Sequence, residues 1–129
     1  MAGDVWIETS DVMPMFPTLV WKIQLQAPKH EAINPKILAA LASMREEAPQ
    51  IAHGWQTDHA LHRLEEFREL ISCIDNAARS VLRFLSIAYD TVEITGCWAN
   101  VLAPGAAHKA HYHPNNFLSG VYYVRTRPG

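Results

Sequence analysis

The clearest constraint on the fold is a change in sequence character near Asp90. Apolar residues between positions 64 and about 88 recur every three or four positions, which predicts a long amphipathic helix with a charged outer face. Residues 91–102 are instead rich in β-branched and aromatic side chains, which favours a strand. Helices followed by strands are typical of an α+β fold, in which the helices pack on one face of an antiparallel sheet.

The N-terminal part of the chain is predicted to contain an earlier strand. Apolar and polar residues alternate over positions 16–25 after Pro17, the pattern of a half-buried strand that begins just past a proline. Residues 1–15 show little periodicity, and we expect a loose arm or a short edge strand there. The row of apolar side chains on one face of the predicted strand consists of Leu19, Trp21, Ile23 and Leu25.

A first helix is predicted between this strand and the long helix. Asn34 is expected to cap it and Pro35 to occupy its first position, where a missing N–H costs nothing. Pro49 is expected to mark its end, and residues 50–60 read as a loop. The apolar stripe of this helix consists of Ile37, Leu38, Leu41 and Met44.

Two more strands are predicted near the C-terminus. Pro104 and Gly105 indicate a turn, after which the histidine-rich residues 108–114 form a second strand. A further turn and a third strand over residues 118–125 complete an antiparallel meander. With 129 residues in all, we expect a single domain spanning positions 1–129.

Composition narrows the classes of partner and compartment. The formal net charge is −2 and no run of Lys or Arg is present, so we expect neither nucleic acid nor an anionic membrane as partner. Cys73 and Cys97 lack CxxC spacing, which predicts free thiols in a reducing cytoplasm. The sequence shows no signal-peptide pattern and no membrane-spanning stretch, which agrees with a cytoplasmic protein.

Two histidines form the strongest candidate site. In an extended segment His111 and His113 point the same way, and two neutral imidazoles on one face can hold a divalent metal. His108 is a weaker candidate, because it falls on the opposite face of a regular strand and would need a bulge to reach the pair. The alternative is that these histidines only occupy a polar loop. His59 and His62 near a helix start read as solvated side chains.

The residues around these histidines resemble a known family signature. The motifs that carry the resemblance are Trp98-x-Asn100, Pro104-Gly105, His111-x-His113-Pro114 and Ser119-Gly120-Val121-Tyr122-Tyr123, preceded by Phe16-Pro17-Thr18 and Gly54-Trp55-x-Thr57. This pattern resembles the Fe(II)/2-oxoglutarate-dependent oxygenases related to the prolyl hydroxylases. The resemblance implies a double-stranded β-helix, or jelly roll, of which this chain would contain the helical front and the first half.

The resemblance also implies cofactors and site roles. Fe(II) and 2-oxoglutarate are the expected cofactors of this dioxygenase class, with His111 as the first metal ligand. His113 stands where the family usually has an acid, which leaves the site one negative charge poorer. Asn100 and either Tyr122 or Tyr123 would orient or bind 2-oxoglutarate, although all three also suit plain structural roles on strands.

The family pattern is incomplete in this sequence. The distal His and the 2-oxoglutarate-binding base that the resemblance implies are not found after Tyr123, so we expect a C-terminally truncated oxidoreductase domain of uncertain enzymatic activity. The alternative is a non-catalytic oligomeric or metal-binding relative. An incomplete sheet leaves an exposed strand edge, which favours a homo-oligomer. The substrate, a small molecule or a peptide, cannot be named from the sequence.

Overall fold

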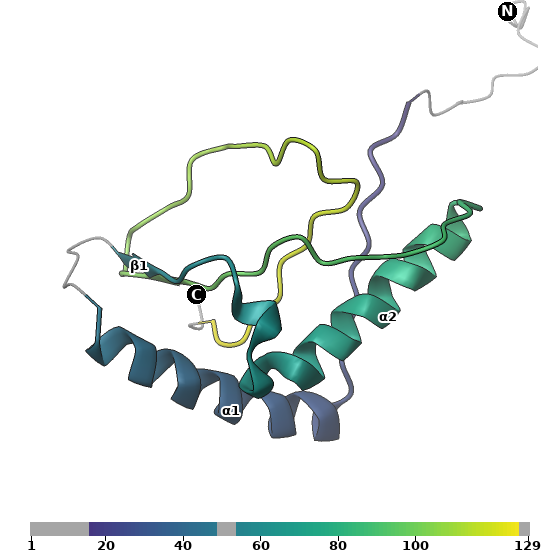
Figure 1. Cartoon of the computed structure of the whole chain (residues 1–129). Helices are drawn as coiled ribbons and strands as arrows, with labels where there is room; N and C mark the ends of the chain where they lie inside the picture. The colour runs from purple at the N-terminus through teal and green to yellow at the C-terminus, as the bar shows by residue number, and fades with distance from the viewer. Residues whose placement is uncertain (1–15, 49–53, 127–129) are drawn as a thin grey trace, which may run out of the picture.

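The computed structural model describes residues 16–48 and 54–126, and these form an α+β arrangement (Figure 1). Helices α1 (Ala27–Glu46) and α2 (Arg68–Phe84) cross below the rest of the chain. Between them lie the short strand β1 (Gly54–Gln56) and two 3-10 turns, η1 (Leu61–Arg63) and η2 (Glu65–Phe67). Strand β2 (Asn100–Leu102) follows α2. The predicted α+β class is therefore confirmed.

Helix α1 begins earlier than the sequence predicted. It starts at Ala27 with Pro28 in its first turn, so Pro35 lies inside the helix and Asn34 is not its cap. Burial explains the difference, because Ile33 is 1% exposed and its place in the core extends the helix back past Pro35. The predicted apolar stripe is confirmed, with Ile37 and Leu41 buried. Pro49, the predicted end, lies outside the described residues.

Helix α2 confirms the long amphipathic helix but with shorter bounds. Residues 61–67, partly assigned to the helix from their periodicity, instead form the two 3-10 turns. The helix ends at Phe84, and Ser86 adopts a left-handed conformation with φ of 54°. Leu70, Val81 and Leu82 are its buried residues.

The sheet is small and antiparallel. Strand β1 pairs with β2, Trp55 standing opposite Val101, and it lies in the segment predicted to be a loop. Gly54 has a φ of 140°, and a Cβ added there would lie 2.9 Å from the Val101 carbonyl oxygen, so the pairing needs glycine. The Thr57 hydroxyl accepts a hydrogen bond from the Ala99 amide at 3.0 Å and extends the contact beyond the strands.

The other predicted strands are wrong for the described residues. Residues 16–25, 108–114 and 118–125 contain no strand, and of residues 91–102 only the last three pair in the sheet. A strand requires a neighbour for its backbone groups, and the described segments do not provide one. The jelly roll therefore stays a prediction, as does the arm over residues 1–15, which lie outside the described part.

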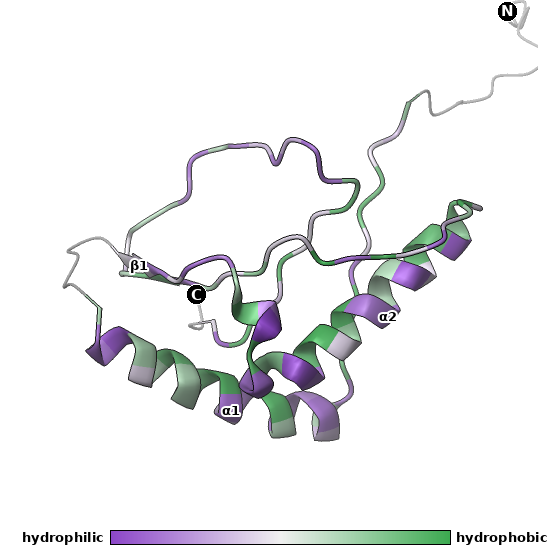
Figure 2. Ribbon diagram, viewed as in Figure 1, coloured by the Kyte–Doolittle hydropathy of each residue, from purple (hydrophilic) through white to green (hydrophobic). Residues whose placement is uncertain are grey.

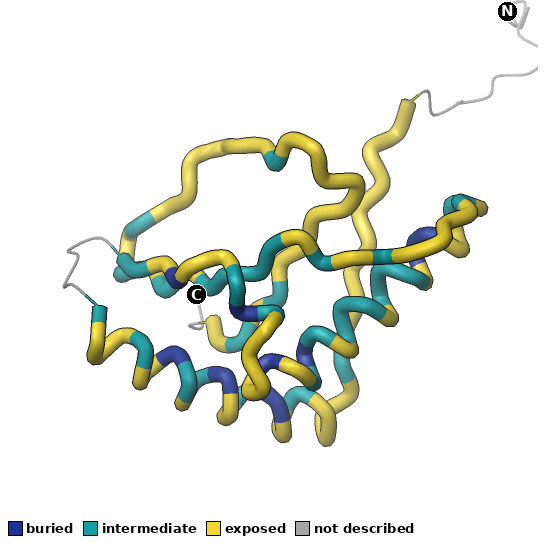
Figure 3. Tube along the Cα trace, in the orientation of Figure 1, coloured by how far each residue is buried: buried dark blue, intermediate teal, exposed yellow. Residues whose placement is uncertain are grey.

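The core lies between the two helices and the overlying β-strand and C-terminal segments. Figure 2 shows apolar and polar residues alternating along both helices, and Figure 3 shows buried positions along α1, around the turns before α2, and near the end of α2. Trp55, Tyr122 and Val124 pack against this cluster. No helix among the described residues has the length and apolar character needed to cross a bilayer. The buried cluster consists of Ile33, Ile37, Leu41, Leu61, Phe67 and Leu70.

Candidate metal site

His111 and His113 lie close together on an irregular loop, not on the strand that was predicted. Their ring centroids are 4.9 Å apart and their planes are inclined by 82°. Two imidazoles bound to one ion through nitrogens about 2.1 Å away have centroids roughly 4.6 to 5.3 Å apart, the shorter for a right angle and the longer for a tetrahedral angle at the metal. The spacing of the two rings is therefore compatible with a shared ion.

The tautomer of His111 is set by its own backbone. Its Nδ1 lies 2.9 Å from the Lys109 carbonyl oxygen, which can only accept a hydrogen bond. In the neutral ring the proton is therefore on Nδ1, and Nε2 keeps its lone pair. A backbone carbonyl that holds Nδ1–H in this way is a common second partner of metal-binding histidines, because it fixes the ring and leaves the other nitrogen free to ligate.

Trp98 lies beside His113, and sequence reasoning missed this contact. The Trp98 and His113 centroids are 5.4 Å apart with their planes tilted by 49°, and Trp98 also stacks on His59 at 4.3 Å with planes only 20° apart. The His59 ring in turn lies 3.2 Å from the Gln56 side-chain amide at the end of β1. A row of neighbouring rings, His59, Trp98 and His113, therefore connects the small sheet to the candidate ligand. His59 and Trp98 are distant in sequence, so the sequence hinted at this contact only through the place of Trp98 in the motif Trp98-x-Asn100.

The described residues do not complete a metal-binding set. The His108 and His111 ring centroids are 5.9 Å apart, wider than the separation for right-angled or tetrahedral binding to one ion. No group of three His, Cys, Asp or Glu side chains suited to a metal occurs in residues 16–48 and 54–126. The histidine loop, residues 103–116, contains no Asp or Glu of its own. The described residues thus bring together two imidazoles, and their role as metal ligands stays a prediction.

Asn34 fastens the C-terminal segment to α1. Its Oδ1 accepts a hydrogen bond from the Tyr122 hydroxyl at 2.7 Å, and its Nδ2 donates to the Val124 carbonyl at 3.0 Å. Desolvation is the main cause that raises the pKa of Tyr122, with the Asn34 hydrogen bond acting in the opposite direction. The side-chain amide of Asn34 thus bonds to the C-terminal segment instead of capping the end of a helix.

The three predicted 2-oxoglutarate contacts have different surroundings. The Tyr122 hydroxyl is engaged by Asn34, so it would have to leave that hydrogen bond to reach a ligand. Tyr123 is 74% exposed and points away from the core. Asn100 is exposed on β2, opposite Gln56 of β1. These positions leave Tyr123 and Asn100 open to a ligand, and their cofactor role stays a prediction.

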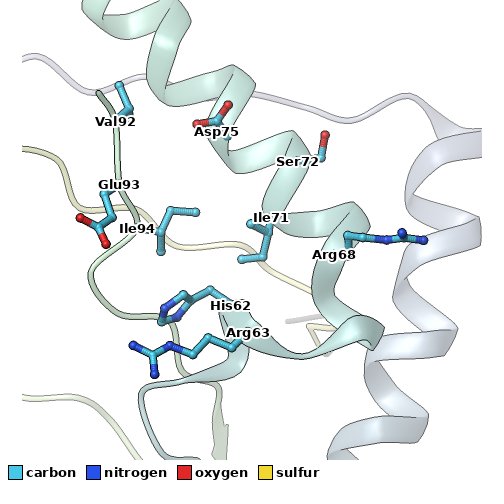
Figure 4. A pocket seen from close by; sticks show the side chains of 9 residues that line it. All are labelled: His62, Arg63, Arg68, Ile71, Ser72, Asp75, Val92, Glu93 and Ile94. Atoms are coloured by element: carbon cyan, nitrogen blue, oxygen red, sulfur yellow. The ribbon is translucent and has the colours of Figure 1, made fainter. Parts of the chain in front are cut away.

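A separate groove lies between α2 and the segment that follows it. Figure 4 shows side chains of α2 facing residues 92–94, with His62 and Arg63 at one end. The groove has a volume of about 540 Å³ and is open to solvent. The Nδ1 atom of His62 is buried there without a hydrogen-bond partner. The lining residues are His62, Arg63, Arg68, Ile71, Ser72, Asp75, Val92, Glu93 and Ile94, none of them a predicted ligand.

Both cysteines are free thiols, as predicted. Burial raises the pKa of the Cys97 thiol, which disfavours the thiolate that metals and oxidants need. Cys97 forms an isolated parallel β-bridge with Ala60. Its role in the described structure is to pack against the core.

Comparison with known families agrees with the motifs of the histidine loop. Residues 96–129 match the model of a family described as "Putative 2OG-Fe(II) oxygenase". The matched region includes Trp98, Asn100, the three loop histidines and both tyrosines of the C-terminal segment. No curated protein and no solved structure gives a significant match to the chain. The comparison supports the oxygenase family at this coarse level, while the prolyl-hydroxylase grouping and the truncation stay predictions.

Proposed function

We propose that this chain is a metal-binding domain of the Fe(II)/2-oxoglutarate oxygenase type, with His111 and His113 as two of the metal ligands. The observation that supports this most is the position of the two rings. They lie at 4.9 Å, within the segment that matches the oxygenase family. Nδ1 of His111 faces a carbonyl, which leaves Nε2 as the ligating atom.

The residues present fit the metal in part. Two neutral imidazoles occupy two coordination positions and bring no negative charge, whereas an acid at position 113 would offset half of the charge of the ion. In oxygenases of this type, bound Fe(II) with 2-oxoglutarate and O₂ supplies the oxidising power for substrate hydroxylation. The tasks of this chain's residues are to hold the ion and, through Asn100 and Tyr123, to orient the cosubstrate beside it.

Turnover is not part of this proposal for the 129-residue chain alone. The described residues supply no third ligand, and iron held by two imidazoles exchanges easily with solvent. We expect cosubstrate chelation without formation of product. The wider jelly roll and a hydroxylase activity belong to an assembly that completes the site. A cytoplasmic location is proposed as well, supported by the two free thiols.

The test is anaerobic addition of Fe(II) and 2-oxoglutarate to the purified chain. Chelation of 2-oxoglutarate by bound iron should produce a weak visible charge-transfer band, and the His111→Ala variant should lack it. The matched control is His30→Ala, a histidine on α1 outside the row of rings formed by His59, Trp98 and His113, which should keep the band. Absence of the band in the wild-type chain would overturn the cosubstrate part of the proposal. Formation of succinate on admission of O₂ would overturn the expected lack of turnover.

A second candidate, a non-catalytic metal-binding relative, is favoured by the all-imidazole donor pair. Imidazole suits Zn(II) and Ni(II), whereas carboxylates suit harder ions. A competition experiment separates the two functions, because a non-catalytic site should hold Zn(II) or Ni(II) and show no optical response to 2-oxoglutarate. Displacement of the bound metal by Fe(II) with 2-oxoglutarate would instead support the oxygenase assignment.

A further inference from the structure

We propose that His59 is a positioning residue for His113 and acts on it through the indole ring of Trp98. This inference rests on the proposed metal site and adds which residue outside the histidine loop sets the orientation of one ligand. The His59 and Trp98 rings are nearly parallel at 4.3 Å, and the Trp98 and His113 rings follow at 5.4 Å. A change at His59 can therefore reach the ligand through one intervening ring.

His113 is the half-buried residue of an otherwise exposed stretch. Every other residue between positions 107 and 121 is exposed, and the loop appears as a mostly exposed arc in Figure 3. The neighbouring ring of His113 outside the loop is that of Trp98. A ring packed against a neighbour loses less rotational freedom when it binds an ion than an exposed ring does. The orientation of His113 before binding therefore depends on where Trp98 lies.

The backbone holds His59 and Trp98 next to each other. The Cys97 amide donates a hydrogen bond to the His59 carbonyl at 3.0 Å, and the Leu61 amide donates one to the Cys97 carbonyl at 3.1 Å. These bonds form the isolated bridge between Ala60 and Cys97, each of which is the sequence neighbour of one of the two rings. The stack is thus built on paired backbones, which makes His59 a fixed support for the indole.

A side-chain amide fixes the His59 ring itself. The Gln56 amide nitrogen lies 3.2 Å from Nε2 of His59, and an amide nitrogen can only donate a hydrogen bond. In the neutral ring Nε2 therefore accepts this bond and the proton is on Nδ1. Neither nitrogen of His59 then has a free lone pair for a metal, so the ring contributes its aromatic face to the site and not a ligand.

The base of the histidine loop has a second attachment that does not involve His59. The Thr95 hydroxyl donates a hydrogen bond to Oδ1 of Asn116 at 3.0 Å, three residues after His113. Asn115 adopts a left-handed conformation with φ of 65°, which asparagine tolerates better than most residues. Removal of the His59 ring should therefore free the Trp98 and His113 rings without detaching the loop.

The first measurement needs no metal. Histidine ring signals of the metal-free chain are recorded by two-dimensional NMR, and the His113 signal is identified by its loss in His113→Ala. The ring current of Trp98 shifts this signal in the wild type, and His59→Ala should move it towards its position in Trp98→Ala. His59→Phe keeps an aromatic face without a ring nitrogen and should retain the wild-type position. The matched control is His30→Ala on α1, which should leave the His113 signal unchanged.

The second measurement is Zn(II) affinity by equilibrium dialysis. His59→Ala should bind Zn(II) about 2- to 10-fold more weakly than the wild type, the range expected for one aromatic contact. His59→Phe should restore the affinity, because the proposed contribution of His59 is its ring face. Far-UV circular dichroism of each variant checks that the helices remain folded.

The contrary results differ in what they say about the proposed metal site. An unchanged His113 signal or wild-type Zn(II) affinity in His59→Ala would overturn the inference and leave that site in place. Equal losses of affinity in His59→Ala and His59→Phe would also overturn it, because His59 would then act through a nitrogen. No Zn(II) uptake by the wild type would remove the proposed site and, with it, the positioning role of His59.

Discussion

Replacing Asn34 by alanine should release the C-terminal segment from α1. The side chain accepts a hydrogen bond from the Tyr122 hydroxyl at 2.7 Å and donates one to the Val124 carbonyl at 3.0 Å. Both contacts join parts of the chain far apart in sequence, and both are partly buried. Their loss therefore removes a tertiary link that the helix itself does not need.

The expected magnitude follows from two opposing terms. Two hydrogen bonds at about 0.5–1.5 kcal/mol each give a loss of about 1–3 kcal/mol. Alanine is a better helix former than asparagine by roughly 0.6 kcal/mol in a helix interior, which offsets part of this loss. The net destabilisation of Asn34→Ala should be about 0.5–2.5 kcal/mol. Tyr122→Phe, which removes only one of the two bonds, should cost about 0.5–1.5 kcal/mol.

A double-mutant cycle isolates the shared hydrogen bond. Urea unfolding followed by far-UV circular dichroism gives the free energy of unfolding for the wild type, both single variants and Asn34→Ala/Tyr122→Phe. The two effects should fail to add by about 1 kcal/mol, because the double variant loses the shared bond only once. Asn76→Ala is the matched control, an exposed asparagine within α2, and it should be neutral or slightly stabilising.

The refuting result is additivity. If the coupling between Asn34 and Tyr122 is below about 0.3 kcal/mol, the hydrogen bond between them does not contribute to stability. If Asn34→Ala instead stabilises the protein as Asn76→Ala does, position 34 acts only through helix propensity. Either outcome would show that the hydrogen bonds of Asn34 do not stabilise the contact between the C-terminal segment and α1.

Three further predictions concern charge and metal binding. Hydrogen bonds from Lys36 and, to a lesser extent, from Lys29 lower the pKa of Glu69. The stabilising effect of the Glu69 carboxylate is therefore present at neutral pH and is lost as pH falls through that depressed pKa. Glu69→Gln should be less stable than wild type at pH 7 and equal to it in acid, and a stability difference independent of pH would contradict this. Trp98→Ala should weaken Zn(II) binding about 10- to 100-fold by freeing the His113 ring, and unchanged affinity in a titration would show that the ring stack has no such role. His113→Asp should shift selectivity from Zn(II) towards Fe(II), measured by competition between the two ions, and an unaltered preference would count against His113 as a ligand.

The helices were the part of the fold that the sequence predicted best. Periodic burial is a local property, so Ile37 and Leu41 could be assigned to the core from spacing alone. The helix boundaries could not be predicted from spacing. Asn34 can either cap a helix or bond Tyr122, and which of the two it does depends on a segment that is distant in sequence. The strands failed for a similar reason, since a β-rich sequence pairs only where a neighbour is present.

The candidate site shows the same division between local and distant information. A spacing of two predicted that His111 and His113 would be neighbours, and the rings lie close although no strand aligns them. The stacking of Trp98 on His59 could not be foreseen, because it depends on the bridge between Ala60 and Cys97, which are distant in sequence. The metal role of the pair stays a prediction.

Metal content of three proteins tests the central claim most directly. Wild type, His111→Ala and His113→Ala are stripped with chelator, dialysed anaerobically to equilibrium against Fe(II) or Zn(II), and analysed for bound metal per chain relative to the dialysis buffer. The account predicts specific uptake by the wild type and its loss in both variants, because one imidazole cannot retain the ion. Equal metal content in all three proteins would contradict the assignment of the two histidines as ligands.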